Sequence, residues 1–270
     1  MLVIFSGGSG VGKNTVIVEL IKGGGFALMP TYTTRDKRVG ESEGNPYCFL
    51  TDAQFKKKIE ENELYEYENV HGHYYGTSKL LLKETLALGK ILLKDIDVLG
   101  TQNLVKSIGK DVKVITLFLK VDSKEVLRQR LTERQETEID KRLARYEMEM
   151  SFCDRYDYII TNDDLFSTKS TVLEIVDAER RGEPFGVIES GAVDDEKVQA
   201  LVKKLNDGET LAPVKIAYIN GAPYIVSGKH EFLAGLISGK HVAKEILNGY
   251  TAEIGDQTEW RNTLTAVQGK

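Results

Sequence analysis

The stretch Ser6-Gly-Gly-Ser-Gly-Val-Gly-Lys-Asn-Thr15 decides the fold of this chain. It fits the spacing Gly-x-x-x-x-Gly-Lys, with Gly7, Gly12 and Lys13 at the fixed positions. An apolar run at residues 2–5 precedes it, which is typical of a buried strand. Apolar residues at helical spacing follow it: Val16, Ile17, Leu20 and Ile21. The pattern predicts a strand, a glycine-rich loop and a helix in succession.

A loop in this position is suited to binding phosphate. Its glycines let backbone N–H groups turn toward phosphate oxygens, and the helix N-terminus adds partial positive charge. Lys13 is placed to reach the β- and γ-phosphates. A chance glycine-rich turn is the alternative, but the flanking strand and helix favour a nucleotide loop. We expect ATP to bind to Gly7, Gly8, Ser9, Gly10, Val11, Gly12, Lys13, Asn14 and Thr15.

Asn14 stands where the usual motif has Ser or Thr, whose hydroxyl binds Mg²⁺. Its amide oxygen is also a hard ligand suited to Mg²⁺, and Thr15 supplies a hydroxyl one position later. We expect Asn14 and Asp95 to bind the metal. Asp95 and Asp97 follow a predicted strand. The sequence does not show whether these two carboxylates bind the metal or position a second substrate.

Composition limits the class of protein. The 270 residues suit one or two domains, and 41% hydrophobic residues can form a buried core. The net charge of −5 argues against a general nucleic-acid binder. Cys48 and Cys153 have no paired metal-ligand spacing, so we expect neither a disulfide framework nor a zinc site. With no basic leader and no apolar run near the ~20 residues of a membrane span, we expect a cytoplasmic protein.

Three further segments narrow the function. They are "TYTTRDKRVGESEGNPYCFL" at 31–50, "ELYEYENVHGHYYGTS" at 63–78 and "KILLKDIDVLGTQ" at 90–102. In this order and spacing they resemble the guanylate kinase family, over roughly residues 1–178. The resemblance implies a P-loop nucleoside-monophosphate kinase, an α/β fold with a parallel sheet. It also implies a transferase that converts ATP and GMP to ADP and GDP, with Mg²⁺.

The resemblance implies where GMP binds. Arginines and tyrosines would hold the 5′-phosphate, because the planar fork of Arg grips phosphate in two places. Glu66 would accept the N1–H and N2–H₂ donors of guanine, whereas the N1 acceptor of adenine would leave the carboxylate unpaired. Taken singly, each residue has a structural alternative, such as a core tyrosine or a solvated arginine. The implied GMP-binding set is Thr31, Arg35, Arg38, Glu41, Tyr47, Glu66, Tyr75, Thr77 and Asp97.

An arginine-rich segment follows a predicted strand at 113–121. Residues 123–152 are helical in composition, with Arg and Glu interleaved. One interpretation is an exposed, salt-bridged helix pair. The family resemblance implies instead a mobile lid that closes over ATP. Phosphoryl transfer depends on positioning and charge neutralisation, and a phosphate dianion is already a nucleophile. The implied catalytic residues are Lys13, Arg38, Arg130, Arg134 and Arg142.

The last third of the chain reads as a second, α+β unit. A helix pattern at 196–209 is followed by a predicted hairpin at Asn220-Gly221 and a helix at 230–237. This order resembles ParB-like and sulfiredoxin-like domains over residues ~185–250. We expect a guanylate kinase-like domain at 1–180 and a ParB-like domain with a tail at 185–270.

The second resemblance implies a turn that holds nucleotide phosphate. Its residues would be Gly228, Lys229 and His230, but Glu231 stands where the pattern has Arg and would repel phosphate. We therefore expect binding rather than catalysis there. In the tail, Trp260 is expected to anchor the chain.

Three alternatives to a guanylate kinase remain open. One is a catalytically inactive guanylate-kinase-like binding module. Another is a kinase whose acceptor is a different phosphorylated sugar or nucleotide, against which Glu66 and Thr77 argue. The third is a regulatory nucleotide-binding protein that acts through the ParB-like region. Retention of Gly7, Gly12 and Lys13 favours the enzyme. A homodimer is compatible with the sequence, and GMP is the expected small-molecule partner.

Overall fold

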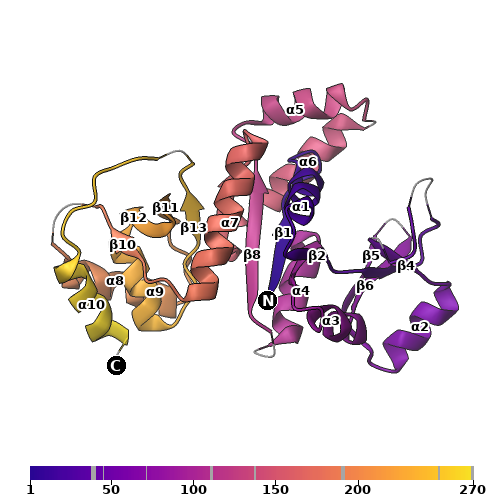
Figure 1. Cartoon of the computed structure of the whole chain (residues 1–270), viewed down its shortest axis with the longest axis horizontal. Helices are drawn as coiled ribbons and strands as arrows, with labels where there is room; N and C mark the ends of the chain where they lie inside the picture. The colour runs from indigo at the N-terminus through magenta and orange to yellow at the C-terminus, as the bar shows by residue number, and fades with distance from the viewer. Residues whose placement is uncertain are drawn as a thin grey trace. The chain divides into compact units, whose positions relative to one another are not determined.

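The computed structural model describes residues 1–37, 41–44, 46–70, 72–109, 112–136, 138–189, 192–248 and 250–268. The chain forms two compact units (Figure 1). The first contains residues 1–7 and 13–117, and the second contains residues 8–12 and 118–270. The described part of the chain holds no helix with the length and apolar character that crossing a membrane requires.

A parallel sheet forms the centre of the first unit, in the order β1-β7-β2. Every residue of β1 is buried, as expected for a parallel strand that is covered on both faces. Leu2, Leu92 and Leu104 belong to one apolar core. The elements are β1 (Leu2–Ser6), α1 (Lys13–Lys22), β2 (Phe26–Leu28), α3 (Lys79–Leu86), β7 (Ile91–Asp95) and α4 (Val98–Ile108). The predicted strand and helix around the glycine loop are therefore confirmed.

A second sheet in this unit has the order β4-β3-β6-β5. Its elements are β3 (Thr31–Thr33), β4 (Tyr47–Phe49), α2 (Asp52–Glu60), β5 (Leu64–Val70) and β6 (His73–Ser78). Phe55 of α2 is fully buried and stacks on Tyr74 with ring centroids 5.2 Å apart. Along β5 the side chains alternate between the two faces, so Glu66 is buried while Tyr67 is 46% exposed.

The arginine-rich segment of the second unit is two helices, α5 (Lys124–Glu133) and α6 (Ile139–Met150). The predicted strand at 113–121 is β8 (Val114–Lys120), which spans the boundary between the units. A short 3₁₀ turn (Cys153–Arg155), β9 (Tyr158–Thr161) and α7 (Leu165–Arg181) follow. Helix α7 ends at Gly182, whose φ of 64° is the left-handed conformation that closes many helices.

The C-terminal elements are β10 (Gly186–Val187), α8 (Asp195–Asn206), β11 (Val214–Ile219), β12 (Ala222–Ser227), α9 (Lys229–Ser238), β13 (Lys244–Ile246) and α10 (Thr258–Gln268). The predicted helices and hairpin are confirmed. Asn220 and Gly221 have φ values of 52° and 76°, the left-handed pair that a two-residue hairpin turn needs. Trp260 is 5% exposed and its Nε1 donates to Phe185 O at 2.7 Å, so it anchors α10 as expected.

The C-terminal strands belong to the same sheet as β9, which lies within the preceding part of the chain. Strand β13 pairs in parallel with β9 on one side and with β11 on the other, in the order β10-β12-β11-β13-β9 (Figure 1). Lys120 and Glu245 form an ion pair of 2.7 Å beside this junction. The sequence does not predict the pairing, because the three residues of β13 are too few to show a periodic pattern. The domain boundary at 180–185 stays a prediction.

Candidate active site

The glycine loop of residues 8–12 is held by an asparagine that sequence analysis assigned no role. Asn162 Nδ2 donates to Val11 O at 2.7 Å, and its Oδ1 accepts from Thr168 Oγ1 at 2.8 Å. A Cβ on Gly12 would lie 2.4 Å from that Nδ2, and Gly12 has a φ of 99°. Both facts require glycine at this position. The polar run Asn162-Asp163-Asp164 after an apolar segment was the available signal, but the partner of Asn162 in the loop could not be predicted from sequence.

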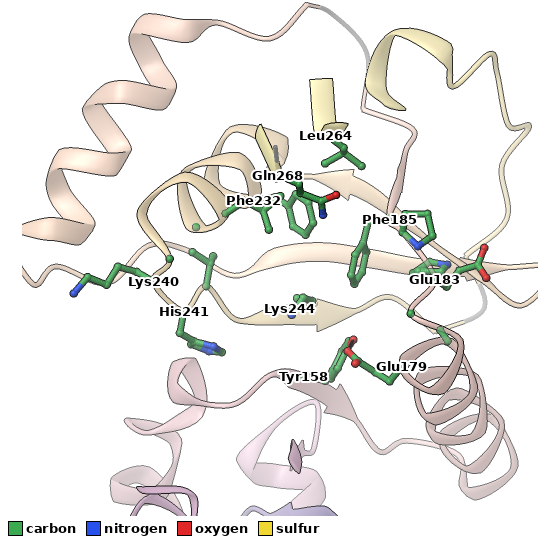
Figure 2. A pocket seen from close by; sticks show the side chains of 18 of the residues that line it. Tyr158, Glu179, Glu183, Phe185, Phe232, Lys240, His241, Lys244, Leu264 and Gln268 are labelled. Atoms are coloured by element: carbon green, nitrogen blue, oxygen red, sulfur yellow. Dashed lines mark hydrogen bonds between the residues drawn. The ribbon is translucent and has the colours of Figure 1, made fainter. Parts of the chain in front are cut away.

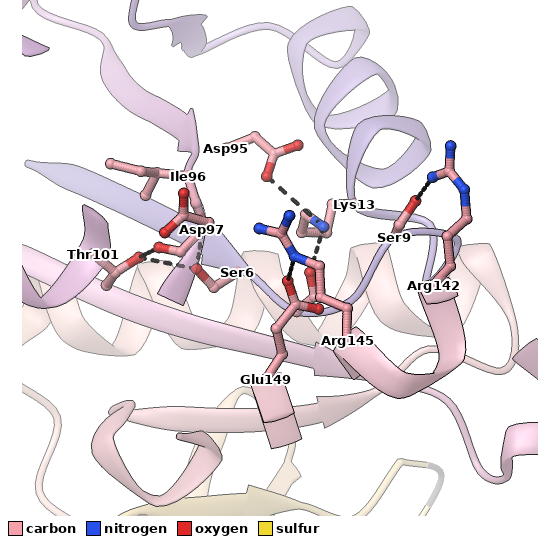
Figure 3. Close-up of polar contacts among 11 residues, drawn as sticks. Ser6, Ser9, Lys13, Asp95, Ile96, Asp97, Thr101, Arg142, Arg145 and Glu149 are labelled. Atoms are coloured by element: carbon pink, nitrogen blue, oxygen red, sulfur yellow. Dashed lines mark hydrogen bonds and ion pairs between the residues drawn. The ribbon is translucent and has the colours of Figure 1, made fainter. Parts of the chain in front are cut away.

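Two of the three predicted lid arginines contact this loop. Arg130 Nη2 donates to Asn162 O at 2.9 Å, and its Nη1 reaches Val11 O at 3.5 Å. Arg142 Nη1 donates to Ser9 Oγ at 2.7 Å (Figure 3). Arg134 ends α5 and is exposed. The alternative of a salt-bridged helix pair also has support in the ion pair of Arg142 with Glu136 at 2.8 Å.

A buried acid on α6 lies next to the loop. Glu149 is 5% exposed, and its Oε1 accepts from Arg145 Nε at 3.0 Å (Figure 3). A Cβ on Gly8 would lie 2.4 Å from the Tyr146 ring and 3.3 Å from Glu149 Oε2. Gly8 therefore allows the loop to approach α6 closely.

Lys13 starts α1 in the first unit. Its Nζ donates to Gly7 O at 2.6 Å and lies 3.9 Å from Asp95 Oδ1 (Figure 3). Asn14, the next residue, is exposed. Asn14 and Asp95 are hard oxygen donors of the kind Mg²⁺ prefers, and Mg²⁺ commonly takes only one or two protein carboxylates beside substrate phosphates. The described residues contain no cluster of three or more Asp, Glu, His or Cys side chains that could hold a metal ion.

Four of the predicted acceptor residues form one cluster at the second sheet, Tyr47 and Tyr75 on its strands and Arg35 and Glu41 in the segment between β3 and β4. Arg35 Nη2 pairs with Glu41 Oε1 at 2.7 Å, and the guanidinium carbon lies 5.1 Å from the centre of the Tyr47 ring. The rings of Tyr47 and Tyr75 meet edge to face at 6.0 Å. The hydrogen bond that Arg35 donates to Glu41 raises the pKa of Arg35, which keeps this guanidinium charged. Arg38, the remaining predicted phosphate ligand, lies outside the described residues.

The predicted base-reading carboxylate is buried on the same sheet. Glu66 is 8% exposed and accepts a short hydrogen bond from Thr77 Oγ1. Burial raises the pKa of Glu66, while the charge of Lys94 and the bond from Thr77 oppose this rise. The carboxylate also lines a cavity of about 560 Å³ together with Tyr65, Tyr67, Asn103 and other residues of β5 and α4. A buried, ionisable acceptor beside a cavity can recognise paired N–H donors.

Lys94 is a charged residue of this region that sequence analysis missed. It is 1% exposed, and its Nζ donates to Thr31 Oγ1 at 2.8 Å. Burial lowers the pKa of Lys94 to about 8, against the opposing effect of Glu66 and Asp95. The available signal was a lysine inside the apolar run Ile-Leu-Leu-Lys, where solvent exposure is not expected.

Asp97 has a structural role in addition to its predicted one. Its Oδ1 accepts from the backbone N–H groups of Leu99 and Gly100, both at 2.9 Å, and so caps α4. Contact between Asp97 and an acceptor nucleotide stays a prediction.

Residues 1–179 match the guanylate kinase family model. The chain is 37% identical over 185 residues to a guanylate kinase of Rickettsia typhi, covering 67% of this chain and 92% of the relative. The chain belongs to the guanylate kinase family.

Other guanylate kinases agree with this assignment. That of Helicobacter pylori is 39% identical over 181 residues, covering 64% of this chain and 85% of the relative. The crystal structure of guanylate kinase from Anaplasma phagocytophilum has a TM-score of 0.53 and 28% identity, covering 66% of this chain and 85% of that chain. The guanylate kinase match thus contains the glycine loop, helices α5 and α6, and the second sheet.

The turn predicted to bind phosphate, at residues 228–230, lies beyond the guanylate kinase match. Its polar groups form hydrogen bonds with other residues of the protein. Gly228 has a φ of 92° and precedes α9. The backbone N–H of Lys229 donates to Glu189 Oε2 at 2.8 Å, and His230 Nε2 accepts from the N–H of Asp194 at 3.0 Å. A carboxylate therefore takes the place at this helix N-terminus where the resemblance implies a phosphate.

A separate cavity of about 670 Å³ lies where α7 and β9 meet the elements that follow the guanylate kinase match (Figure 2). Phe185 and Phe232 form part of its apolar wall, with ring centroids 5.1 Å apart. Lys244 Nζ lies 4.9 Å from the centre of the Tyr158 ring, and Tyr158 donates to Glu179 at 2.7 Å. The predicted turn of residues 228–230 does not line this cavity.

Proposed function

We propose that this guanylate kinase transfers the γ-phosphoryl group of ATP to GMP and releases ADP and GDP. Glu66 supplies the observation that carries the proposal. It is a buried carboxylate on the same sheet as the cluster of Arg35, Tyr47 and Tyr75. The cluster that contains the Arg35 guanidinium suits the phosphate end of a purine monophosphate. The buried Glu66 carboxylate, a hydrogen-bond acceptor, suits the base at its other end.

The acceptor site uses two kinds of recognition. Arg35 would exchange part of its pairing with Glu41 for the 5′-phosphate of GMP, a planar contact that guanidinium groups favour. Tyr47 and Tyr75 would donate hydroxyl hydrogen bonds to the same phosphate. Glu66 would accept from N1–H and N2–H₂ of guanine, with Thr77 and Thr31 beside it.

The donor site uses positive charge and backbone N–H groups. Residues 8–12 would surround the phosphates of ATP, and Arg130 and Arg142 would move from their present protein acceptors to phosphate oxygens. Lys13 would offset the charge that spreads over the transferred group. Asn14 and Asp95 would hold Mg²⁺, which supplies further charge neutralisation when bound. A phosphate dianion needs no general base to attack.

A coupled assay of ADP release with the full chain tests this function. We expect turnover with ATP and GMP, at least about 100-fold weaker turnover with AMP, and loss of the GMP preference in Glu66→Gln. The alternative of an inactive binding module predicts GMP binding by calorimetry without ADP release. If the full chain binds neither GMP nor ATP, the proposal is wrong.

A second proposal concerns the region after residue 185. The observed order of helix, hairpin, glycine turn and helix supports a ParB-like domain with a ligand site at Gly228, Lys229 and His230. Because Glu189 already accepts from the N–H of Lys229, an anion must displace that carboxylate. Titration with ATP of the full chain and of its His230→Ala variant, counting the sites by calorimetry, tests for a site here besides the glycine loop. A second site that disappears in His230→Ala supports the proposal, and a single site in the full chain contradicts it.

The cellular setting also stays a proposal. Cys48 and Cys153 are free thiols, which is consistent with a reducing, cytoplasmic location. Association into a homodimer and the lack of nucleic-acid binding remain predictions from the sequence.

A further inference from the structure

Lys94 is a buried cation near the predicted base-reading carboxylate, Glu66. Its side chain leaves strand β7 and is 1% exposed. Lysine is rarely buried to this extent, because removing its charge from water is costly unless partners compensate. The burial of Lys94 directly after the apolar residues Ile91–Leu93 therefore calls for a reason beyond packing.

The protein satisfies only part of the hydrogen-bonding capacity of this ammonium group. An ammonium carries three N–H donors. Within the described residues, one hydrogen bond from Lys94 is found, to Thr31 Oγ1 at 2.8 Å. Glu66 is close enough to interact electrostatically with Lys94, yet no ion pair within 4.0 Å joins them among those residues. Lys94 thus keeps donor capacity beside a buried carboxylate.

The register of the second sheet places this pair at the base-reading end of the site. Glu66 pairs with Thr77 across β5 and β6, and Tyr32 pairs with Gly76 across β3 and β6. Thr31, which receives the hydrogen bond of Lys94, is one residue before Tyr32 and so lies next to Thr77. Lys94 through its bond to Thr31, and Glu66 through its bond from Thr77, thus bring opposite charges to neighbouring positions of this sheet.

We infer that Lys94 is a specificity-determining residue that donates a hydrogen bond to O6 of guanine while Glu66 accepts from N1–H and N2–H₂. This inference rests on the proposed function. On guanine, the O6 acceptor adjoins the N1–H donor, which matches an ammonium beside a carboxylate. Adenine places an amino group at position 6 and an acceptor at N1, so it would be mismatched with both residues. Lys94 would distinguish 6-oxo from 6-amino purines.

A structural role is the competing explanation. Lys94 would then only fix Thr31 and balance the charge of Glu66, without touching the base. Both explanations predict that removing the lysine weakens GMP use. They differ in whether the loss depends on the atom at position 6 of the purine, because only a direct contact is sensitive to that atom.

The experiment compares the wild type and Lys94→Met, each with GMP and with 6-thioguanosine monophosphate. In the thio analogue sulfur, a weak hydrogen-bond acceptor, replaces O6. In the wild-type full chain we expect kcat/KM to fall about 10–100-fold from GMP to the thio analogue, mainly through KM. In Lys94→Met we expect GMP use to fall by a similar factor and the thio analogue to lose little more. Lys94→Gln, which retains an N–H donor, should restore part of the GMP preference.

Each outcome decides between the explanations. A wild-type enzyme that uses both substrates within about twofold contradicts the inference even if no variant folds. So does a Lys94→Met variant that keeps the full wild-type discrimination against the thio analogue. Lys120→Met, which removes another partly buried strand lysine, should leave that discrimination unchanged. A wild-type chain that does not phosphorylate GMP refutes the proposed function itself, which is a separate result.

Discussion

The pKa of Glu66 is raised by burial and lowered by the nearby charge of Lys94. The protonation state that results affects the binding of GMP. Burial raises the pKa of Glu66; Lys94 and Thr77 lower it, and the charges of Asp97 and Glu68 raise it further. Guanine requires the ionised form, since a protonated carboxyl cannot accept from both N–H groups. We therefore expect KM for GMP to rise on acidification at a higher pH than the ordinary value of 4.5 would give. KM measured as the pH is lowered toward 4.5 should show this rise in the wild type, whereas Glu66→Gln should bind weakly at every pH.

The same pKa has a consequence for stability. Because the folded-state pKa of Glu66 lies above its unfolded value, its favourable contribution is complete below about pH 4.5 and is lost as the pH rises through the folded pKa. Glu66→Gln should thus unfold at a higher temperature than the wild type at pH 7, with the difference disappearing near pH 4. Equal melting temperatures at pH 7 would contradict the assignment of a destabilising buried charge.

Lys13 provides a test of the donor site at a single residue. Lys13→Met removes the cation expected to offset charge on the transferred group, and we expect kcat to fall by about 100-fold or more. Lys22→Met, at the other end of α1 with a 67% exposed side chain, is the matched control and should retain wild-type kcat. A Lys13→Met variant with more than a tenth of wild-type activity would remove Lys13 from the mechanism.

Single residues were predictable from sequence where a motif fixes their spacing. Gly12 and Lys13 follow from the loop pattern, and Glu66 and Arg35 follow from the family resemblance. Lys94 and Asn162 were not predicted, because each acts through a partner that is distant in sequence. Lys94 bonds to Thr31 across 63 positions and Asn162 to Val11 across 151, and no local pattern carries such pairings.

At the scale of elements, the glycine loop is shaped by the turn that carries Asn162. Gly12→Ala would place a methyl group 2.4 Å from Asn162 Nδ2 and so disturb the hydrogen bond to Val11 O. We expect KM for ATP to rise at least about tenfold, since the loop must shift away from its phosphate-binding conformation. Steady-state kinetics at varied ATP measures this effect.

Gly24→Ala is the matched control for that variant. Gly24 also has a positive φ, of 81°, but nothing lies within 4 Å of the added Cβ. It should therefore lose about 1 kcal/mol of stability from backbone strain while keeping the wild-type KM for ATP. Equal effects of the two substitutions would show that strain, and not the contact with Asn162, is responsible.

Elements were predictable in proportion to their length and periodicity. The five buried residues of β1, the lid helices and the hairpin at Asn220-Gly221 all carry strong local patterns. The short strands β10 and β13 carry none. Helix α10 lies in a tail that gave no prediction beyond Trp260, whose burial against Phe185 O is a tertiary contact.

At the scale of the whole molecule, the residues after the guanylate kinase match complete a sheet. Strand β13 pairs with β9 at Lys244–Tyr158, Glu245–Ile159 and Ile246–Ile160. Ending the chain at Arg181 would remove these hydrogen bonds and the ion pair of Lys120 with Glu245. It would also uncover the edge of β9, whose residues Tyr158, Ile159 and Ile160 are at most 3% exposed in the full chain.

We therefore expect the chain of residues 1–181 to unfold at a lower temperature than the full chain and to aggregate more readily. An uncovered apolar strand edge both loses buried area and offers unpaired N–H and C=O groups to another chain. Thermal unfolding and light scattering at equal concentration measure the two effects. Ile246→Asp in the full chain is the matched variant, because it places a charge in the β13–β9 pairing without shortening the protein, and it should lower the melting temperature in the same direction. If residues 1–181 melt at the temperature of the full chain, the C-terminal strands are an independent domain, as the sequence alone predicts, and their pairing with β9 contributes nothing to stability.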